Sequence, residues 1–436
     1  MKVALVAPAV PYRLQDAPDL QFPPLALCYL GGLARGLGHD VTLIDMTVSN
    51  MGLEELADRL VSVRPDLVGI SSLSASFPCA VALATLSKKV VPEAAVVMGG
   101  MHPTFTDLRT LETTDTDVVV RNEGEATFAE LLSCLDGKAN GKLDGVPGIT
   151  YRDEEGVIRR NPPRDFIRDL DALPAPAYDL LDTLPIYLKL QVFLIITSRG
   201  CPYSCAFCSS APFWGRRWRA RSVSSVLEEV EKWVTTYGAR RVVFGDDNFA
   251  FDQKRVYDLC LALKQRALGI DWRCSVRADT LNKPLLAAMR ESGCSALFIG
   301  VESGSQASLD RLRKREKVRH SVDAVRWCRE VGLETTCAML LGLPWETEED
   351  VRANIRFVNE DLRPDEVVWN LLHPDPGSEF YSHLEEYGLR FVINDLSRHI
   401  GNAPAVVETS RLSADSLNQL WMEACLTAGT VGDTVS

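Results

Sequence analysis

Residues 192–210 read VFLIITSRGCPYSCAFCSS, an apolar run followed at once by three closely spaced cysteines. The apolar run is rich in β-branched and aromatic residues, which is typical of a buried strand. Cys201, Cys205 and Cys208 follow with C-x3-C-x2-C spacing, and the glycine and proline beside the first of them indicate a loop. This stretch therefore predicts a strand whose end carries three thiols on one loop.

Strands and helices alternate downstream of this loop. Six strands with crossover helices predict a partial, TIM-like (β/α)6 barrel over residues 191–385, with its chemistry at the C-terminal ends of the strands. The cysteine loop follows the first of these strands. The other five are expected at residues 240–249, 271–279, 296–305, 334–344 and 366–377.

The chain upstream of the loop also alternates strand and helix. Residues 1–138 predict a doubly wound, Rossmann-like α/β domain with a ligand at the strand C-termini. Residues 139–190 are rich in Pro, Gly and Asp and predict a connector of turns and short strands. Residues 386–436 predict a short helical cap. The expected fold class is therefore α/β in both main domains.

Composition limits the classes of function. The chain has 436 residues, 46% of them hydrophobic, and a formal net charge of -12. The basic runs RRWRARS and RLRKREK are interpreted as solvated helix faces, so no nucleic-acid partner is expected. There is no apolar run of the roughly 20 residues that span a bilayer, and no signal-peptide pattern. We expect a cytoplasmic, monomeric enzyme without a membrane partner.

The cysteine spacing points to a metal centre. Three thiolates on one loop can hold three corners of a [4Fe-4S] cluster and leave the fourth iron without a protein ligand. Zinc is the alternative, but structural zinc sites have four ligands, and residues 209–228 contain neither Cys nor His. The other nine cysteines are scattered singly through apolar segments and are expected to be buried small hydrophobes.

With Phe207 before its last cysteine, the motif resembles the signature of radical S-adenosylmethionine (SAM) enzymes, in which the open iron of the cluster binds SAM. The resemblance continues at the ends of the later strands. It implies that VFGDDNF meets the SAM amino group, that IGVESGS meets the ribose and that MLLGLP meets the adenine. For the acidic residues, a solvated strand end or a helix cap is the alternative. The implied SAM-binding residues are Asp246, Asp247, Ser275, Arg277, Glu302 and Leu341.

The N-terminal domain resembles a cobalamin-binding domain. Small residues end two neighbouring strands, which lets the nucleotide tail of the corrin pass into the sheet. The segment RNEGEATF resembles the G-E-x-T turn beside that tail, and an ordinary flavodoxin-like sheet is the alternative. The implied cobalamin-binding residues are Ser71, Leu73, Ser74, Gly99, Gly100, His102, Glu123, Gly124, Glu125 and Thr127.

One departure concerns the lower face of cobalt. Some cobalamin domains carry an Asp-x-His-x-x-Gly loop whose histidine binds cobalt, but residues 22–32, FPPLALCYLGG, contain no histidine. The lower ligand is therefore expected to be absent or to come from elsewhere. His39 and His102 are the candidates if a nitrogen does bind, and His102 is more readily interpreted as a contact to the tail.

Over residues 1–385 the chain resembles the cobalamin-dependent radical SAM family, the class B radical SAM methyltransferases. The resemblance implies a C-methyltransferase that uses a 5'-deoxyadenosyl radical and methylcobalamin, with an external electron donor of the ferredoxin or flavodoxin type. The substrate is a protein, a peptide or a small molecule. The chain resembles, in its compact size, the methanogen enzymes that methylate a glutamine of methyl-coenzyme M reductase. This resemblance favours peptidyl glutamine as its substrate. A cyclase or rearrangement enzyme without methyl transfer, and a cobalamin sensor with a vestigial cluster, are the alternatives.

Overall fold

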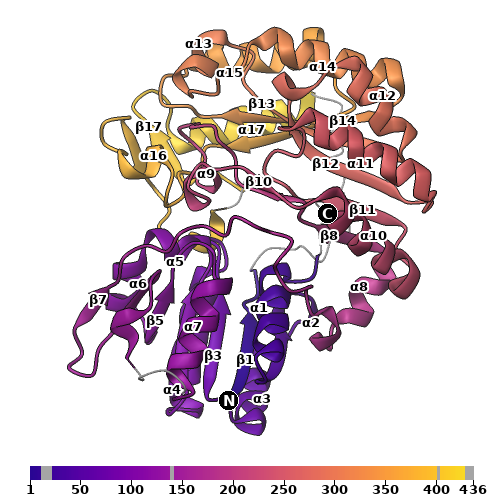
Figure 1. Cartoon of the computed structure of the whole chain (residues 1–436). Helices are drawn as coiled ribbons and strands as arrows, with labels where there is room; N and C mark the ends of the chain where they lie inside the picture. The colour runs from indigo at the N-terminus through magenta and orange to yellow at the C-terminus, as the bar shows by residue number, and fades with distance from the viewer. Residues whose placement is uncertain (11–21, 138–141, 400–402, 428–436) are drawn as a thin grey trace. The chain divides into compact units, whose positions relative to one another are not determined.

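A computed structural model describes residues 1–10, 22–137, 142–399 and 403–427. The chain forms two compact units, Met1–Leu190 (unit 1) and Gln191–Ser436 (unit 2) (Figure 1). The domain boundary expected between residues 138 and 139 lies outside the described residues. Among the described helices, none is both long and apolar enough to cross a membrane.

Unit 1 is built on one seven-stranded sheet in the order β2-β1-β3-β4-β5-β6-β7. The first five strands are parallel, and β6 and β7 pair antiparallel at one edge. Successive residues of a strand point to opposite faces, so strands that are apolar throughout must be covered on both sides. The strands are β1 (Lys2–Ala7), β2 (Asp40–Asp45), β3 (Leu67–Ser71), β4 (Ala95–Gly99), β5 (Val118–Val120), β6 (Ile149–Arg152) and β7 (Ile158–Arg160).

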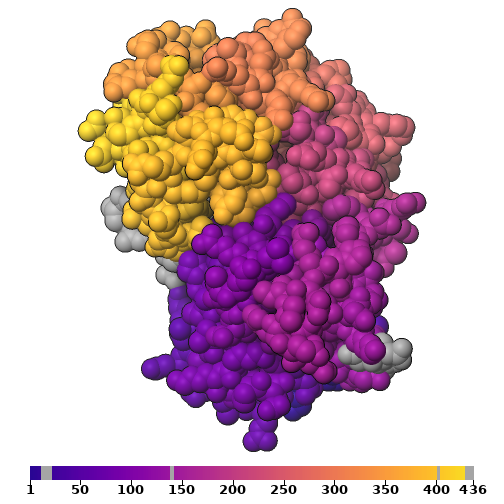
Figure 2. All heavy atoms as spheres, turned by 90° about the vertical axis from the view of Figure 1, so that its left-hand side faces the viewer, coloured from indigo at the N-terminus to yellow at the C-terminus, as the bar shows by residue number. Residues whose placement is uncertain are grey.

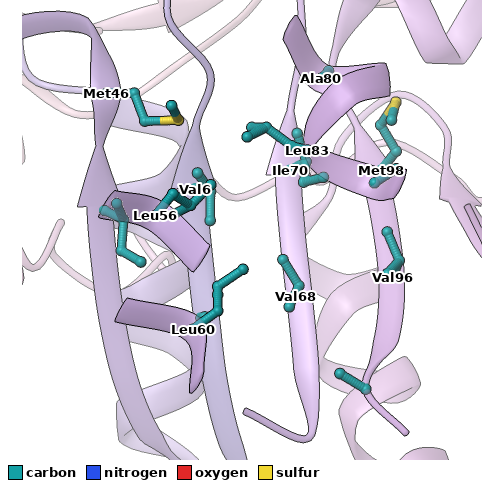
Figure 3. Packing of buried hydrophobic residues seen from close by; sticks show 14 of the residues in the cluster. Val6, Met46, Leu56, Leu60, Val68, Ile70, Ala80, Leu83, Val96 and Met98 are labelled. Atoms are coloured by element: carbon teal, nitrogen blue, oxygen red, sulfur yellow. The ribbon is translucent and has the colours of Figure 1, made fainter. Parts of the chain in front are cut away.

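Helices cover both faces of the unit 1 sheet, which confirms the predicted doubly wound α/β fold. Apolar side chains of α3 and α4 pack against alternate residues of the central strands, such as Val68 and Ile70 of β3 (Figure 3). On the other face, α1 packs on β1 and β2 and contacts α7. The helices of unit 1 are α1 (Leu25–Gly36), α2 (Met46–Ser49), α3 (Leu53–Val63), α4 (Phe77–Val90), α5 (Met101–Phe105), α6 (Asp107–Thr113), α7 (Glu125–Leu135) and α8 (Leu184–Leu190).

The segment expected to be a connector adds two strands to this sheet. β6 pairs with β5 and β7 pairs with β6, so the edge of the parallel strands is covered by an antiparallel hairpin. The guanidinium of Arg121, directly after β5, donates to the carbonyl oxygen of Ile149 at 3.1 Å and fixes the hairpin to the sheet.

Unit 2 is built on six parallel strands in the order β15-β14-β13-β12-β11-β8, which confirms the predicted partial barrel. Figure 1 shows helices α10, α11, α12, α14 and α15 along the outside of this sheet. The six strands are β8 (Val192–Ile195), β11 (Arg241–Phe244), β12 (Asp271–Arg277), β13 (Cys294–Glu302), β14 (Glu334–Leu341) and β15 (Glu366–Leu371).

The helices of unit 2 mostly begin and end where the sequence offers a cap. The Ser222 hydroxyl accepts from the amide of Ser225 at the start of α10, and Gly238, with φ 70°, ends that helix. The helices of unit 2 are α9 (Ser210–Phe213), α10 (Val223–Tyr237), α11 (Gln253–Arg266), α12 (Lys283–Glu291), α13 (Gln306–Arg311), α14 (Val318–Val331), α15 (Glu348–Phe357), α16 (Glu379–Ser382) and α17 (Ala414–Thr427).

The C-terminal part of unit 2 differs from the expected helical cap. Besides α17, which packs on β15 and α15, it contains an antiparallel pair, β16 (Leu389–Phe391) and β17 (Val407–Thr409). These C-terminal segments, coloured amber to yellow, lie at the surface of unit 2 in the face that Figure 2 shows.

Candidate functional site

The three cysteines lie on the loop that leaves the first strand of the unit 2 sheet. β8 ends at Ile195, and the cysteine loop, residues 200–210, follows the short strand β9 (Ser198–Arg199). Gly200 has φ 86°, and a Cβ there would lie 2.3 Å from the carbonyl oxygen of Arg217, so the start of the loop requires glycine. All three cysteines are free thiols.

Hydrogen bonds hold the cysteine loop at both ends and in the middle. The Asp247 carboxylate, after β11, accepts from the amide of Gly200 at 3.2 Å and from the hydroxyl of Ser210. The amide of Ala206 donates to the carbonyl oxygen of Leu312 at 3.0 Å, and the carbonyl oxygen of Ala206 accepts from the first amide of α16 at 3.0 Å. The cysteines are thus positioned by three separate segments of unit 2.

The chemistry of the thiols fits an iron–sulfur cluster. Burial raises the pKa of all three thiols, that of Cys208 to about 12, so they need a metal to displace the proton. In the described ranges, no three or more His, Cys, Asp or Glu side chains stand close enough to share one metal ion. In a [4Fe-4S] cluster each cysteine binds a different iron, so its ligands stand farther apart than those of zinc.

Asp246 is a fully buried carboxylate that organises the end of β8. It accepts from the amide of Thr197 at 2.7 Å, from the Thr197 hydroxyl at 2.5 Å and from the Ser198 hydroxyl at 2.6 Å. Burial raises its pKa, and these donors oppose the rise. The carboxylates of Asp246 and Asp247 therefore bind the cysteine loop itself and the residues directly before it. Their expected contact with the SAM amino group stays a prediction.

Arg277, at the end of β12, lies beneath the cysteine loop. Its guanidinium donates to both carboxylate oxygens of Asp279 at 3.0 Å and to the carbonyl oxygen of Lys314 at 2.7 Å. The same group lies 3.6 Å from the ring centroid of Tyr203, which stands between the first two cysteines. Its positive charge lowers the pKa of Cys205, against the effect of burial.

A buried ion network completes this end of the sheet. Lys314 is 3% exposed, and its Nζ lies 3.0 Å from Glu302 and 3.3 Å from Glu316. Glu302 ends β13, where the register shifts between Gly300 and Glu302 and Glu302 takes φ 69°. A bulge of this kind re-aims a side chain at a functional edge. Glu316 in turn accepts from the amide of Asp279 at 3.1 Å, so the network joins β12 to β13.

The end of β14 is shaped by a buried glutamate. Leu341 is buried, and after it the amides of Gly342 and Leu343 both donate to Glu346 at 2.9 Å. The other oxygen of this carboxylate accepts from the side-chain amide of Asn354 at 3.0 Å. Burial raises the pKa of Glu346 to about 7, and the two backbone donors oppose the rise. This turn is the segment that the sequence predicts to face adenine.

The remaining predicted residues of unit 2 take supporting positions. Phe207 packs on a core cluster that includes Leu312 and Leu343, and Ser275 accepts from the amide of Phe249 through its carbonyl oxygen at 3.1 Å. Sequence reasoning missed Tyr203, Asp279, Lys314, Glu316 and Glu346.

The interpretation of RLRKREK as a solvated helix face is wrong. The segment continues past the end of α13 into the loop before α14, and it alternates between buried and exposed residues, with Lys314 and Glu316 inside. The signal in the sequence was a charged run in which every second residue is basic, with Leu312 and Glu316 among the residues between them.

In unit 1, small residues line the predicted cobalamin edge. Ser71 at the end of β3 pairs with Gly99 at the end of β4, and the amide of Ser72 donates to the carbonyl oxygen of Gly99 at 2.9 Å. Gly100 has φ 101°, and a Cβ there would lie 2.4 Å from the carbonyl oxygen of Ser72. The two loops therefore touch through their backbones, and Leu73 beside them is 58% exposed.

The histidines of unit 1 occupy different edges of the sheet. His102 is buried, its Nδ1 lies 3.2 Å from the Ser74 hydroxyl, and its ring centroid lies 4.1 Å from that of Phe77. His39 directly precedes β2, so it lies at the N-terminal edge of the parallel strands. Since the predicted cobalamin edge is the C-terminal one, His39 is no longer a candidate for the cobalt ligand.

The predicted G-E-x-T turn forms the start of α7. Glu123 accepts from the amide of Ile167 at 2.8 Å, and Thr127 accepts from the guanidinium of Arg164 at 2.8 Å. Glu125 is buried in the first turn of the helix, and Gly124 directly precedes it. The turn therefore binds residues that follow the hairpin, and its contact with a cobalamin tail stays a prediction.

Comparison with known proteins agrees with this geometry. Residues 17–132 match the model of the B12 binding domain, and residues 195–358 match that of the radical SAM superfamily. The uncharacterized methyltransferase PH0819 of Pyrococcus horikoshii is 34% identical over 97% of this chain and 91% of its own length. An anaerobic magnesium-protoporphyrin IX monomethyl ester cyclase of Rubrivivax gelatinosus is 27% identical over 83% of this chain and 66% of its own length.

Among solved structures, the radical SAM methyltransferase TsrM of Kitasatospora setae superposes with a TM-score of 0.78. It is 19% identical and covers 98% of this chain, while 88% of TsrM is covered, so the two proteins share a fold. That structure contains cobalamin and a [4Fe-4S] cluster. Cobalamin, a [4Fe-4S] cluster and SAM are the cofactors that the two matched domains require. With its B12 binding domain, its radical SAM domain and a full-length methyltransferase relative, the chain belongs to the cobalamin-dependent radical SAM methyltransferases.

Proposed function

We propose that this enzyme transfers a methyl group to an unactivated carbon of its substrate. The observation that carries the proposal is the loop of Cys201, Cys205 and Cys208, three free thiols held beside the buried cations Arg277 and Lys314. When bound, the cluster supplies the electron that cleaves SAM, and cobalamin carries the methyl group. The protein supplies position, charge and exclusion of water.

In unit 2, we propose that the three cysteines hold the cluster and that the strand ends bind SAM. Glu302, re-aimed by the bulge in β13, is the proposed acceptor for the ribose hydroxyls. The Gly342 and Leu343 turn, fixed by Glu346, is the proposed adenine contact. Asp247 then acts by holding both ends of the cysteine loop.

In unit 1, we propose that the edge around Ser71, Gly99 and Gly100 admits the nucleotide tail of cobalamin. Glycine at position 100 lets the loops after β3 and β4 meet through their backbones, since a Cβ there would lie 2.4 Å from the carbonyl oxygen of Ser72. Leu73 and Ser74 would lie under the corrin, and the Nδ1 of His102 already lies 3.2 Å from the Ser74 hydroxyl. The lack of a histidine in residues 22–32 favours a corrin without a strong lower nitrogen ligand.

For the substrate, we propose a neutral carboxamide, such as the side chain of a peptidyl glutamine. His373 follows β15, at the edge of the sheet where barrel enzymes bind substrates. Burial and the neighbouring His399, whose ring centroid is 6.3 Å away, lower its pKa to about 4, so it is neutral at pH 7. Within the described residues its Nε2 is buried without a hydrogen-bond partner, and a neutral imidazole nitrogen accepts from an amide N–H.

The test is a mass measurement with labelled SAM. The reconstituted protein is incubated with host extract peptides and SAM that carries a deuterated methyl group, with Cys205→Ala as the control. We expect a peptide that gains one labelled methyl on a glutamine carbon, and no such peptide with the control. Labelling of a small molecule instead would leave the methyltransferase in place and exclude the peptide substrate.

A cyclase is the second candidate, since three relatives are named cyclases. The same experiment separates the two. A product that has lost two hydrogens and carries no label would overturn the proposed methyl transfer.

A further inference from the structure

The segment between α13 and α14 alternates between inward and outward residues. Leu312, Lys314 and Glu316 are buried at 0%, 3% and 1% exposure. The intervening residues are exposed, and the backbone at two of them, Arg313 and Arg315, has φ 56° and 60°. All four outward residues are basic. We call them the basic segment; they are Arg311, Arg313, Arg315 and Lys317.

The inner side of this segment touches the cysteine loop. The carbonyl oxygen of Leu312 accepts from the amide of Ala206, the residue after Cys205, at 3.0 Å. One chain segment therefore has the cluster ligands on its inner side and solvent on its outer side.

The outer side of the segment carries positive charge that is only partly compensated. Arg313 pairs with Glu379, and Arg311 lies 5.0 Å from the ring centroid of Trp345. In the described parts of the chain, Arg315 and Lys317 form no ion pair. The whole chain has a net charge of -12, so this concentration of cations runs against the overall balance. Exposed charge of one sign steers oppositely charged partners and raises their association rate.

We propose that the basic segment is the docking surface for a small acidic protein that carries one electron at a time. The proposal rests on the proposed function, because cleavage of SAM requires an electron from outside the enzyme. On docking, the reduced carrier loses one electron and the cluster gains it, and no proton or covalent bond is exchanged. Charge complementarity selects the carrier, and the contact of Leu312 with the cysteine loop makes the path through the protein short.

The test uses flavodoxin, an acidic one-electron carrier, and the reconstituted full-length enzyme. The variant is Arg315→Glu/Lys317→Glu, which reverses the two cations without an ion partner. The control is Lys232→Glu/Arg240→Glu, which changes the net charge equally. Both control residues are exposed, and Arg240 directly precedes β11, at the opposite edge of the sheet from the cysteine loop.

Two quantities are measured: the Kd for flavodoxin at low and high salt, and the rate of SAM cleavage with flavodoxin or with dithionite as reductant. We expect the variant to bind flavodoxin about tenfold more weakly at low salt, with a smaller difference at high salt, where charges are screened. Flavodoxin-driven cleavage should fall by a similar factor at subsaturating flavodoxin. Dithionite-driven cleavage should match the wild type, and the control should match it in all assays.

Unchanged flavodoxin binding in the variant, or an equal loss in the control, would overturn the proposal. Loss of dithionite-driven cleavage in the variant would also overturn it, because the change would then act on the SAM site. Tight binding of an RNA oligonucleotide that the variant abolishes, with flavodoxin binding intact, would assign the segment to nucleic acid instead. If the wild type fails to cleave SAM with dithionite, the proposed function fails, while the flavodoxin Kd still decides the docking surface.

Discussion

The C-terminal edges of the two sheets are built in opposite ways. In unit 2, the edge beside the cysteine loop contains a buried network of charged side chains, which are those of Arg277, Glu302, Lys314 and Glu316. In unit 1, backbone and hydroxyl contacts form the predicted cobalamin edge, which lies around Ser71, Gly99 and Gly100. The edge in unit 2 is thus held together by charged side chains, and the edge in unit 1 by backbone contacts at residues with small side chains or none.

This difference follows from what each edge has to hold. Thiolates and a charged cosubstrate need fixed counter-charges, and buried charges persist only where each is paired. A bulky cofactor that enters a sheet needs space, which only glycine and other small residues leave between two strand ends. The two edges should therefore respond differently to substitution, and each prediction below tests one side of the comparison.

The largest effect is expected at the cysteine loop. Cys205→Ala should abolish iron binding and SAM cleavage, because the loop offers three thiols and each is a corner of the cluster. Cobalamin binding should stay at the wild-type level, since its proposed site lies in the other unit. Iron counting, 5'-deoxyadenosine release and cobalamin absorbance measure the three outcomes. Cys328→Ala, a buried cysteine on α14, is the control and should keep the iron.

The reverse pattern is expected for Gly100→Ala. The new Cβ would lie 2.4 Å from the carbonyl oxygen of Ser72, at a residue with φ 101°, so the loops of β3 and β4 must separate. We expect cobalamin affinity to fall at least about tenfold, with a stability cost of about 1–3 kcal/mol, while iron content is retained. Gly52→Ala is the control, since a Cβ there meets nothing within 4 Å and Gly52 has φ -81°.

Loss of iron in the Gly100→Ala variant together with cobalamin would contradict the comparison. The two sites would then depend on one another for folding. Equal cobalamin affinity in both glycine variants would remove this edge as the cobalamin site.

The sequence predicts the cysteine triplet and the glycine pair at these two edges, but not the buried charges around the first. The cysteine triplet and the glycine pair are local patterns whose chemistry depends on residue type alone, and both stand at strand ends as expected. The burial of Lys314 and Glu316 was not predicted, because a run of charges is usually solvated. Here two residues with left-handed backbone turn alternate side chains inward. Short strands were expected after β5, but the pairing of β6 and β7 with the unit 1 sheet was not predicted, because such short strands in a Pro- and Gly-rich segment acquire their pairing from the edge of β5.

A smaller effect on cofactor binding, with a larger cost in stability, is expected from the buried network. Lys314→Met leaves the Glu302 and Glu316 carboxylates without their shared cation, and breaking a buried pair in this way costs about 4 kcal/mol. The KM for SAM should rise as well, because Glu302 loses its fixed position. Thermal unfolding and SAM kinetics measure these two effects. Lys254→Met removes an exposed pair with Asp258 and should leave the stability nearly unchanged.

The smallest effect concerns pH and the buried carboxylate of Glu346. Burial raises its pKa from the usual 4.5 to about 7, so the folded state holds a proton that the unfolded state has already released. Stability from this group is full below about pH 4.5 and is lost as the pH rises through 7. Between pH 5 and pH 7.5 the loss amounts to about 2 kcal/mol.

Glu346→Gln should remove that part of the pH dependence, since a glutamine does not titrate. The buried Asp246, Asp247 and Glu316 carboxyls, whose pKa values are also raised, change in the same direction but are present in both proteins and cancel in the comparison. The measurement is hydrogen exchange in peptides of β14 at the two pH values, which reports on unit 2 without unit 1. Glu349→Gln, on the exposed side of α15, is the control and should keep the wild-type slope. A Glu346→Gln slope equal to that of the wild type would show that the turn after β14 does not titrate and that the ionised carboxylate accepts from Gly342 and Leu343 at both pH values.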